Sequence, residues 1–569
     1  MLLLCTGTAS AAEIMVGSGE TYTTITMGVA AASSGDTITV GDGTYTENVD
    51  IYKNNIIIRS QNGSASTTVV ANSASDEVFS VSGDNVTISG FNITGATSYR
   101  SGVYLYIGSS DCTISNNTIT GNYYGIRART DSNNTIITNN TISNSNGYGI
   151  EIEDSTGNTL TNNTMLLNYY NFGLYGSSVT DYLHDIDTSN LVDGKPIYYW
   201  LNISDATIPS NAGVVYAINC TNIIIQDAEI SNEIYGIYFR NTTDSSIENV
   251  IISDCGDAVD FDYSSNNTIT DSNFSMNGDG IDIYYSNNCT FTNITAIDSG
   301  DAAHFDNSNN STLTDSNVSL SGDYGIYVED SYYCTLTDNI AIDCDYSGIY
   351  VEDSYYCTLT DNIAFYADDE YGNIYLEDSY YCTLTGNNAS YSDDYYGIYV
   401  YDSDNCTLTD NIALSNYDEG IYIDSSDNCT LTNNTAIDND DTGIYLYYSD
   451  NCILSGNIAS DQSDDEGIHI DSSNNCTLTD NTANGNYYSG IYVEDSYYCT
   501  LTGNDACYTD YEYGNIYLED SYYCTLTGNN ASYSDDYYGI YIDSSNNCTL
   551  TDNIALSNYD GNYSALLLQ

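Results

Sequence analysis

Proline, basic residues and long apolar runs are scarce in this 569-residue chain. It holds two prolines, seven lysines and arginines together, three histidines and one tryptophan. The net charge is −73, and no basic residue follows Arg240. Such a surface repels nucleic acids and anionic lipids, so neither is an expected partner. No apolar run reaches the length of a membrane span, and the sequence predicts none.

A repeat of 23 to 25 residues fills the C-terminal part of the chain instead. The string GIYVEDSYYCTLTDN recurs with small changes, and each copy holds two alternating apolar runs separated by Gly, Asn, Asp and Ser. Such runs are typical of half-buried strands that end in turns. The period is too short for a strand plus a crossover helix. It therefore predicts coils of short strands that stack on one another, which is a parallel β-helix.

Several strings resemble a known family. NNTIT, NNCTLTDN and GIYV are similar to the repeats of right-handed parallel β-helix proteins. The first hundred residues, with TYTTITMGVAAASSGDTITVGDGTYTENVDI and VTISGFNIT, resemble the capped start of the NosD-like and pectin-lyase-like branch, and Asp185–Trp200 resembles a segment common in NosD-like domains. The resemblance implies an all-β, single-stranded right-handed solenoid of roughly twenty coils. It fixes no activity, because lyases, hydrolases, epimerases, adhesins and copper-site maturation factors share this architecture.

The expected organisation has three parts. Residues 1–12 resemble the end of a secretory signal, residues 13–80 form a cap and the first coils, and residues 81–569 form the β-helix, with no visible C-terminal cap. The amphipathic stretch Tyr22–Ala32 is expected to cover the first coil. Residues 372–399 and 514–541 are identical, which marks a duplicated six-coil block. The signal remnant and many NCT sequons predict a secreted or cell-surface glycoprotein.

Ten cysteines recur once per coil in the repeats. They are Cys334, Cys357, Cys382, Cys406, Cys429, Cys452, Cys476, Cys499, Cys524 and Cys548. Stacked coils hold equivalent Cβ atoms about 4.8 Å apart, whereas a disulfide prefers about 3.8 Å. We therefore expect a buried thiol ladder. Copper, which the NosD resemblance suggests, is not expected, because the chain has no His-rich or Met-rich tract.

Acidic residues also recur at equivalent positions, and like charges on adjacent strands repel. Calcium ions bound at the turns would relieve this repulsion, and so would a saline habitat around a solvated surface. The candidate calcium ligands are Asp368, Asp369, Asp393, Asp394, Asp440 and Asp441. Upstream, Arg127 and Arg129 are expected to pair with Glu151 and Glu153 one coil away.

The outward positions of the GIYVED strand are mostly a tyrosine and an acid. This stripe is interpreted as cross-strand packing, as a sugar-binding surface, or as an interface for lateral association with copies of the chain. The candidate substrate-binding residues are Tyr238, Tyr284, Tyr327, Tyr350, Tyr375 and Tyr399.

Four successive coils depart from this rule and form a candidate catalytic patch. It comprises Arg240, Asp260, Asp262, Asp282, His304 and Asp306. Carboxylates beside a histidine can perform acid and base chemistry on a polysaccharide, or Arg240 and His304 merely relieve aspartate repulsion. We therefore predict an exported cell-surface rod with a structural or glycan-binding role. The alternatives are a polysaccharide lyase, epimerase or hydrolase acting at this patch, and a NosD-like copper-site maturation factor.

Overall fold

The computed structural model describes residues 11–368, 371–509, 514–534, 538–558 and 566–567. The chain forms a right-handed parallel β-solenoid of about 23 turns, as predicted. It divides into a first unit, Met1–Asp260, and a second unit, Phe261–Gln569. Among the described residues, no helix has the length and apolar character needed to cross a membrane.

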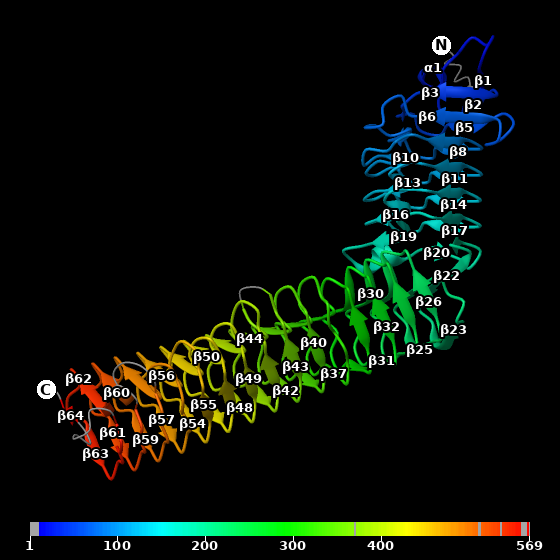
Figure 1. The fold of residues 1–569 in the computed structure, drawn as a ribbon. Coiled ribbons are helices and arrows are strands. Elements are labelled where there is room, and N and C mark those ends of the chain that lie inside the picture. Colours follow the sequence, from blue (N-terminus) through cyan, green and yellow to red (C-terminus); the bar gives the residue numbers. More distant parts are fainter. Residues whose placement is uncertain (1–10, 369–370, 510–513, 535–537, 559–565, 568–569) are drawn as a thin grey trace, which may run out of the picture. The chain divides into compact units, whose positions relative to one another are not determined.

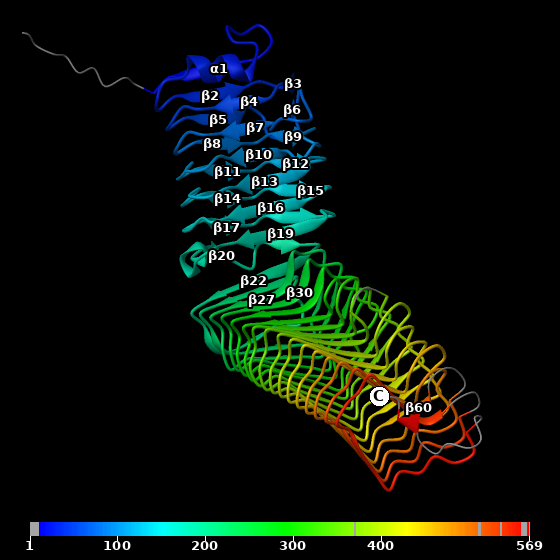
Figure 2. The ribbon, with the colours of Figure 1, turned by 90° about the vertical axis from the view of Figure 1, so that its left-hand side faces the viewer.

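The first unit begins with a helical cap. Helix α1 (Ile25–Ala31) starts at Thr24, whose side chain accepts a hydrogen bond from the Met27 amide at 3.2 Å. Ile25 and Val29 are buried against β1 (Glu13–Val16), β2 (Thr37–Val40) and β4 (Val49–Ile51). Figure 2 shows α1 at the end of the stack of coils. The expected cover over the first coil is therefore confirmed.

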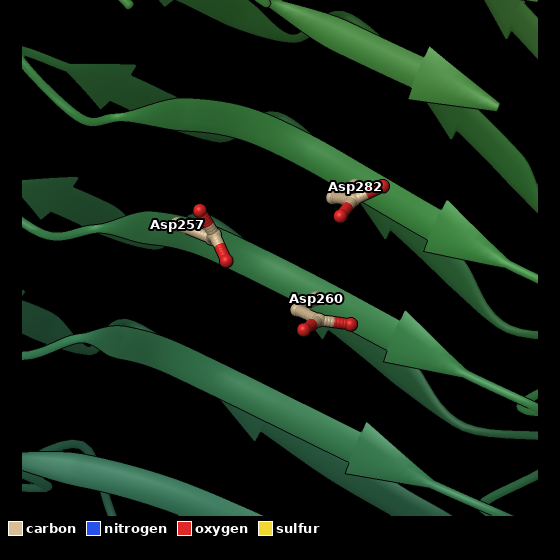
Figure 3. Close-up of side chains that lie close together, drawn as sticks. All are labelled: Asp257, Asp260 and Asp282. Carbon is tan, nitrogen blue, oxygen red and sulfur yellow. The ribbon is translucent and has the colours of Figure 1, made fainter. Parts of the chain in front are cut away.

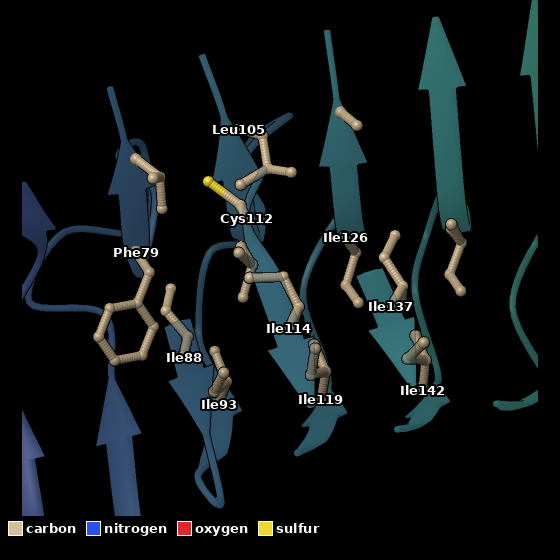
Figure 4. Packing of buried hydrophobic residues seen from close by; sticks show 14 of the residues in the cluster. Phe79, Ile88, Ile93, Leu105, Cys112, Ile114, Ile119, Ile126, Ile137 and Ile142 are labelled. Carbon is tan, nitrogen blue, oxygen red and sulfur yellow. The ribbon is translucent and has the colours of Figure 1, made fainter. Parts of the chain in front are cut away.

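Coils of the first unit stack in register. Strands β8 (Thr87–Ser89), β11 (Thr113–Ser115) and β14 (Ile136–Thr138) pair in parallel and align Ile88, Ile114 and Ile137. These side chains point into the core, where Phe79 and Cys112 are also fully buried (Figure 4). Because side chains alternate along a strand, every second residue enters this core and the others face outward.

One sheet of the first unit ends at β19 (Tyr170–Tyr175), and a new sheet begins with β22 (Lys195–Leu201), β24 (Val214–Ile218) and β27 (Tyr235–Arg240). The segment Asp185–Trp200 supplies β20 (Asp185–Ile186), β21 (Leu191–Val192) and β22, and β21 and β22 pair antiparallel. Along the edge strand β19, the buried carboxylate of Glu233 accepts a hydrogen bond from the Phe172 amide at 2.9 Å, and the Asn232 carbonyl accepts one from the Asn171 amide at 2.9 Å. These two residues thus supply acceptors that a neighbouring strand would otherwise provide.

The second unit is more regular than the first (Figure 1). One of its sheets carries the GIYVED strands: β36 (Ala303–Asp306), β38 (Ile326–Glu329), β41 (Ile349–Glu352), β44 (Ile374–Glu377), β47 (Ile398–Tyr401), β50 (Ile421–Asp424), β53 (Ile444–Tyr447), β56 (Ile468–Asp471), β58 (Ile491–Glu494), β60 (Gly514–Glu519) and β62 (Tyr538–Asp543). A second sheet holds the CTLT strands, such as β39 (Thr335–Thr337) and β42 (Thr358–Thr360), and a third holds β40 (Ile340–Ile342) to β55 (Ile458–Ser460).

An asparagine ladder connects the coils of the second unit. Asn434 is fully buried, its amide nitrogen donates to the Asn457 side-chain oxygen at 3.0 Å, and its oxygen accepts from Asn411 at 2.9 Å. The same bonds join Asn339, Asn362, Asn387, Asn411, Asn434, Asn457, Asn481, Asn504, Asn529 and Asn553. The first unit has a shorter ladder of this kind through Asn117, Asn140 and Asn163.

The cysteines stack as predicted. Every cysteine in the described part of the chain is a free thiol, and all but Cys548 are buried; Cys5 lies outside that part. Burial raises the pKa of Cys289 to about 12, which keeps this thiol protonated. In the ladder the sulfurs donate weak hydrogen bonds to carbonyls, as from Cys429 to Ser403 at 3.5 Å. These thiols therefore pack as small apolar groups.

Candidate functional site

An unbroken column of aromatic rings runs along the outward side of the GIYVED sheet. Adjacent ring centroids lie between 4.6 and 5.1 Å apart, and the ring planes are within 25° of parallel. We call this set the aromatic column. Its members are His304, Tyr327, Tyr350, Tyr375, Tyr399, Tyr422, Tyr445, His469, Tyr492, Tyr517 and Tyr541.

A second layer of tyrosines covers part of the column. Tyr324 lies 5.1 Å from both Tyr327 and Tyr350, and Tyr371 lies 5.0 Å from Tyr375. Tyr350 and Tyr375 are consequently only 6% and 3% exposed. The expectation of an exposed aromatic stripe is therefore wrong at these rungs. Tyr324, Tyr371 and Tyr396 stand two or three residues before β38, β44 and β47, a sequence signal that the outward-position alignment did not include. Glu419 and Thr442 hold the equivalent positions before β50 and β53.

The stacking limits how the column could bind a sugar. Ring faces in the column contact the rings above and below, so a ligand would reach ring edges and phenol oxygens instead of faces. Tyr284 is different, because it is 39% exposed on β33 (Asp279–Tyr284). The substrate-binding role of Tyr327, Tyr350, Tyr375 and Tyr399 stays a prediction.

Phenol groups separate the stacked carboxylates of the second unit. The Tyr327 hydroxyl donates to Glu352 at 2.5 Å, that of Tyr350 to Glu377 at 2.6 Å, and that of Tyr492 to Glu519 at 2.7 Å. Burial, followed by the charges of Asp306 and Glu352, raises the pKa of Glu329. Hydrogen bonds from phenols thus stabilise stacked carboxylates in this sheet, while bound calcium and a saline habitat stay predictions.

His304 lies at one end of the column in an acidic setting. Strands β33 and β36 pair Asp282 with His304 and Tyr284 with Asp306, and β38 follows with Glu329. The His304 Nδ1 is 3.4 Å from Asp282 Oδ1, and its Nε2 is 3.7 Å from Glu329 Oε2. Burial opposes the charged imidazolium, but the hydrogen bond to Asp282 and the surrounding carboxylates outweigh it. The pKa of His304 is raised to about 9.

Two further carboxylates adjoin this cluster. Asp279 accepts a hydrogen bond from the Asp301 amide at 2.9 Å, and Asp301 accepts one from the Tyr324 amide at 3.0 Å. Burial raises the pKa of Asp301 to about 6, and nearby Asp279 adds to this shift. We call His304 and these carboxylates, Asp279, Asp282, Asp301, Asp306 and Glu329, the His304 cluster. At neutral pH it holds a protonated imidazole that can act as an acid and, in Asp301, a carboxylate that can act as a base. Asp279 and Asp301 escaped the sequence analysis because they stand at strand entries, outside the aligned outward positions.

The remaining patch residues occupy different surroundings. In the first unit, Arg240 is 8% exposed, and its NH1 donates to the Tyr238 hydroxyl at 3.3 Å. Tyr238 is also buried, because Tyr182 stacks on it at 5.4 Å, so its prediction as a substrate-binding surface residue is wrong. Asp260 and Asp262 lie on β30 (Asp257–Asp262), and Figure 3 draws Asp257 and Asp260 from this strand together with Asp282.

Only some of the acidic residues at the turns lie close to one another. Oxygens of Asp418, Glu419 and Asp441 lie within 4.8 Å of one another, so one predicted calcium ligand, Asp441, joins two neighbours. The other candidates, Asp368, Asp393, Asp394 and Asp440, are not in this group, and Asp369 lies outside the described residues. Burial raises the pKa of Asp418 to about 7 and that of Glu419 to about 8.

These donors do not suit copper. The described groups of three or more side chains that could hold an ion contain carboxylates alone. Carboxylates favour hard cations such as Ca²⁺, whereas copper prefers imidazole, thiolate or thioether ligands. His184 is buried in the first unit and accepts a hydrogen bond from the Asn158 amide, and His304 and His469 stack separately between or beside tyrosines.

Comparisons with known proteins give the following matches. The profile of the family described as "Periplasmic copper-binding protein (NosD)" matches residues 29–192, 199–318, 271–435 and 462–568, and that of the "Right handed beta helix region" matches 367–506. No curated protein sequence matches the chain.

Solved structures with a similar fold include three carbohydrate-active proteins. The periplasmic alginate epimerase AlgG is 14% identical, with 63% of this chain and 79% of that chain covered and a TM-score of 0.33. The A-module of mannuronan C-5 epimerase AlgE4 from Azotobacter vinelandii is 12% identical, with 96% and 94% covered and a TM-score of 0.20. The alginate lyase from Paenibacillus sp. str. FPU-7 is 16% identical, with 47% and 89% covered and a TM-score of 0.24.

Proposed function

Since the chain belongs to the NosD family of right-handed parallel β-helix proteins, we propose that it is an exported structural rod whose second unit is a spacer. The supporting observation is the constant register of the GIYVED sheet. Tyr327, Tyr350 and Tyr375 align residue for residue across β38, β41 and β44, and the same alignment continues to β62. Several of these side chains bond to the next coil, as Tyr327 does to Glu352 and Tyr350 to Glu377.

Export is part of this proposal. Asn428 and Asn475, in NCT sequons, are exposed at turns of the second unit, where an enzyme could attach a glycan. The signal-like residues 1–10 lie outside the described part of the chain, so the support comes from the sequons and from a family described as periplasmic.

The duplicated block offers a direct test of the spacer role. Deleting residues 372–513 joins Tyr371 to Gly514 and removes six coils, as counted from Cys382 to Cys524, while the residues after the junction repeat those removed. The variant should fold with an unchanged melting temperature and be shorter by about 29 Å at ~4.8 Å per coil. Small-angle X-ray scattering measures the length, and circular dichroism measures the melting.

The outcomes discriminate between a spacer and a binding or catalytic block. If the block is a spacer, the six-coil deletion shortens the protein and leaves its folding unchanged. A deletion of half a coil breaks the register of the strands and serves as the control that should not fold. Loss of folding in the six-coil variant would show that the block is not modular. Loss of a glycan-binding signal on an array, with folding intact, would assign binding to the removed coils.

A second candidate function rests on the His304 cluster. A histidine with a pKa near 9 beside an aspartate with a pKa near 6 provides an acid and a base for polysaccharide cleavage or epimerisation. Purified protein should then convert an acidic polysaccharide, and Asp282→Asn and His304→Gln should each abolish turnover. His469→Gln, which alters the same column away from the cluster, is the matched control. A broad substrate panel without turnover would eliminate this candidate.

A further inference from the structure

We propose that the aromatic column relays one-electron oxidising equivalents between tyrosines of the second unit, with neighbouring carboxylates accepting the phenolic protons. This redox activity goes beyond the spacer role. The relay segment runs from Tyr327 to Tyr445, six tyrosines on consecutive strands with ring centroids 4.9 to 5.1 Å apart. Nearly parallel rings at this spacing are close neighbours, and a short distance between donor and acceptor favours rapid electron exchange.

The relay segment ends at a histidine. His469 stacks on Tyr445 at 4.7 Å and on Tyr492 at 4.6 Å. An imidazole gives up an electron less readily than a phenol, so His469 separates the long tyrosine segment from the shorter one, Tyr492 to Tyr541. His304 stands in the same way beside Tyr327 at the other end. The two imidazoles therefore delimit the relay segment.

Phenol oxidation also needs a proton acceptor, and carboxylates beside the aromatic column supply it. The Tyr327 hydroxyl donates to Glu352, and the Tyr350 hydroxyl donates to Glu377. Tyr422 and Tyr445 donate to Asp424 and Asp471 at 3.3 and 3.4 Å. Each of these phenols can thus lose its proton along an existing hydrogen bond, without moving a charge into the protein interior.

Each transfer step conserves electrons and protons. A one-electron oxidant of high potential, such as a peroxide-derived radical, removes an electron from Tyr327 while its proton moves to Glu352. The products are a neutral tyrosyl radical, a neutral carboxylic acid and the reduced oxidant. Tyr350 then gives an electron to the Tyr327 radical and its proton to Glu377, and Tyr327 recovers its proton from Glu352. The radical has moved by one coil, and no atom is gained or lost.

The covering tyrosines protect such a radical from solvent. Tyr324 packs on Tyr327 and Tyr350, Tyr371 on Tyr375, and Tyr396 lies 4.8 Å from Tyr399. Tyr350 and Tyr375 are nearly inaccessible as a result. A buried radical has fewer routes to cross-linking or reaction with water than an exposed one, which favours transfer along the column.

The test places an oxidant near one end and a trap within the segment. In a full-length Cys548→Ala background, Asp306→Cys carries a tethered ruthenium polypyridyl complex, which flash-quench photolysis converts to ruthenium(III). The trap is 3-aminotyrosine in place of Tyr399, since it is oxidised more easily than tyrosine and has nearly the same shape. Transient absorption and electron paramagnetic resonance measure the yield and rate of the aminotyrosyl radical.

Tyr350→Phe is the decisive variant. Phenylalanine keeps the stacked ring but has no hydroxyl, so the trap radical should be lost while thermal unfolding shows an intact fold. Tyr356→Phe is the matched control, because Tyr356 belongs to the same coil but stacks at a turn with Tyr333 and Tyr381, outside the aromatic column. This control should keep the yield of the parent.

A second variant tests the proton step. Glu377→Gln removes the acceptor for Tyr350 and should slow trap oxidation, with a larger solvent deuterium effect in the parent than in the variant. The proposal is overturned if ruthenium(III) forms in the parent without any aminotyrosyl radical. It is equally overturned if Tyr350→Phe keeps the parental rate, since the oxidant would then reach the trap without the column.

Discussion

The two units balance their negative charge in different ways. All seven basic residues of the chain precede Phe261, and in the first unit Arg127 Nε lies 2.6 Å from Glu151 and Arg129 NH1 2.6 Å from Glu153, as the sequence predicted. The second unit has no lysine or arginine. It uses phenol hydroxyls and raised carboxyl pKa values instead. A solenoid can therefore stack acids either by pairing them with cations or by hydrogen bonding them to phenols, in surroundings that raise the pKa of a carboxyl group.

The units also differ in regularity. The first unit contains a sheet that ends at β19, a 3-10 helix (Val179–Tyr182) and a buried Glu233 that caps an edge strand. The second unit repeats the same contacts at almost every coil. Irregular coils create individual environments for single residues, whereas regular coils create ladders. The His304 cluster lies at the start of the regular part, where aspartates and a histidine stand in place of tyrosines.

Breaking the asparagine ladder should have the largest effect, and it should be similar in both units. Asn434→Leu leaves the Leu408 carbonyl and the Asn411 amide group without their buried partners. Each unsatisfied group costs about 1–3 kcal/mol, so we expect a loss of ~3 kcal/mol or more in the free energy of unfolding. Asn140→Leu makes the equivalent change in the first unit, where the amide donates to Ile114 and Asn163. Denaturant unfolding of both variants measures the losses. A loss confined to one unit would show that the ladder does not have the same role in each.

The stability of the two units should depend on pH in opposite directions. The folded-state pKa values of Asp418 and Glu419, about 7 and 8, exceed those of ordinary carboxyl groups, about 4. The folded second unit therefore holds protons that the unfolded chain has released, so this stability is present below pH 4 and is lost as the pH rises through 7 to 8. Melting temperatures should be higher at pH 5 than at pH 8.5, and Asp418→Asn should flatten this dependence.

His184 in the first unit provides the contrast. Burial lowers its pKa to about 4, so its contribution to stability is present above pH 6.5 and is lost as the pH falls toward 4. His184→Gln should remove this acid-side loss and leave the alkaline loss of the second unit unchanged. Identical pH profiles for the two variants would contradict the assignment of opposite responses to the two units.

A divalent cation should act on the second unit and depend on pH. Calcium bound by Asp418, Glu419 and Asp441 would keep these groups deprotonated, so millimolar Ca²⁺ should raise the melting temperature more at pH 8.5 than at pH 5. Asp441→Asn should reduce the rise, whereas Asp368→Asn, outside the group, should not. Equal stabilisation by magnesium and by sodium at matched ionic strength would indicate screening in place of a site.

The ion pairs of the first unit should matter least. Arg129 and Glu153 are partly exposed, so Arg129→Met should lower the free energy of unfolding by about 0.5 kcal/mol, an effect that salt reduces. Arg59→Met, at a still more exposed pair with Glu13, should have less effect. A loss above that of Asn140→Leu would reverse the order proposed for the first unit.

The repeat period and strand alternation predicted most of the fold. The recurrence of Cys357 and Leu359 at a fixed offset sufficed to place both in the core, because stacked coils repeat each environment. Exposure was harder to predict, since it depends on the path of the turns. Tyr350 was correctly placed on the outward side, yet Tyr324 from a preceding turn covers it. For the same reason the alignment of strands missed Asp301, which lies beside His304 but enters from a turn.

The asparagine ladder makes the second unit sensitive to slow deamidation. Each ladder amide donates one hydrogen bond to the next asparagine and one to a leucine carbonyl of the preceding coil, as Asn434 does to Asn457 and Leu408. The spontaneous hydrolysis of one amide to a carboxylate would remove both donors and set acceptors against each other inside the solenoid. Deamidation at a single rung would then weaken the contact between two coils, and such damage would accumulate with age at the coils that open most often.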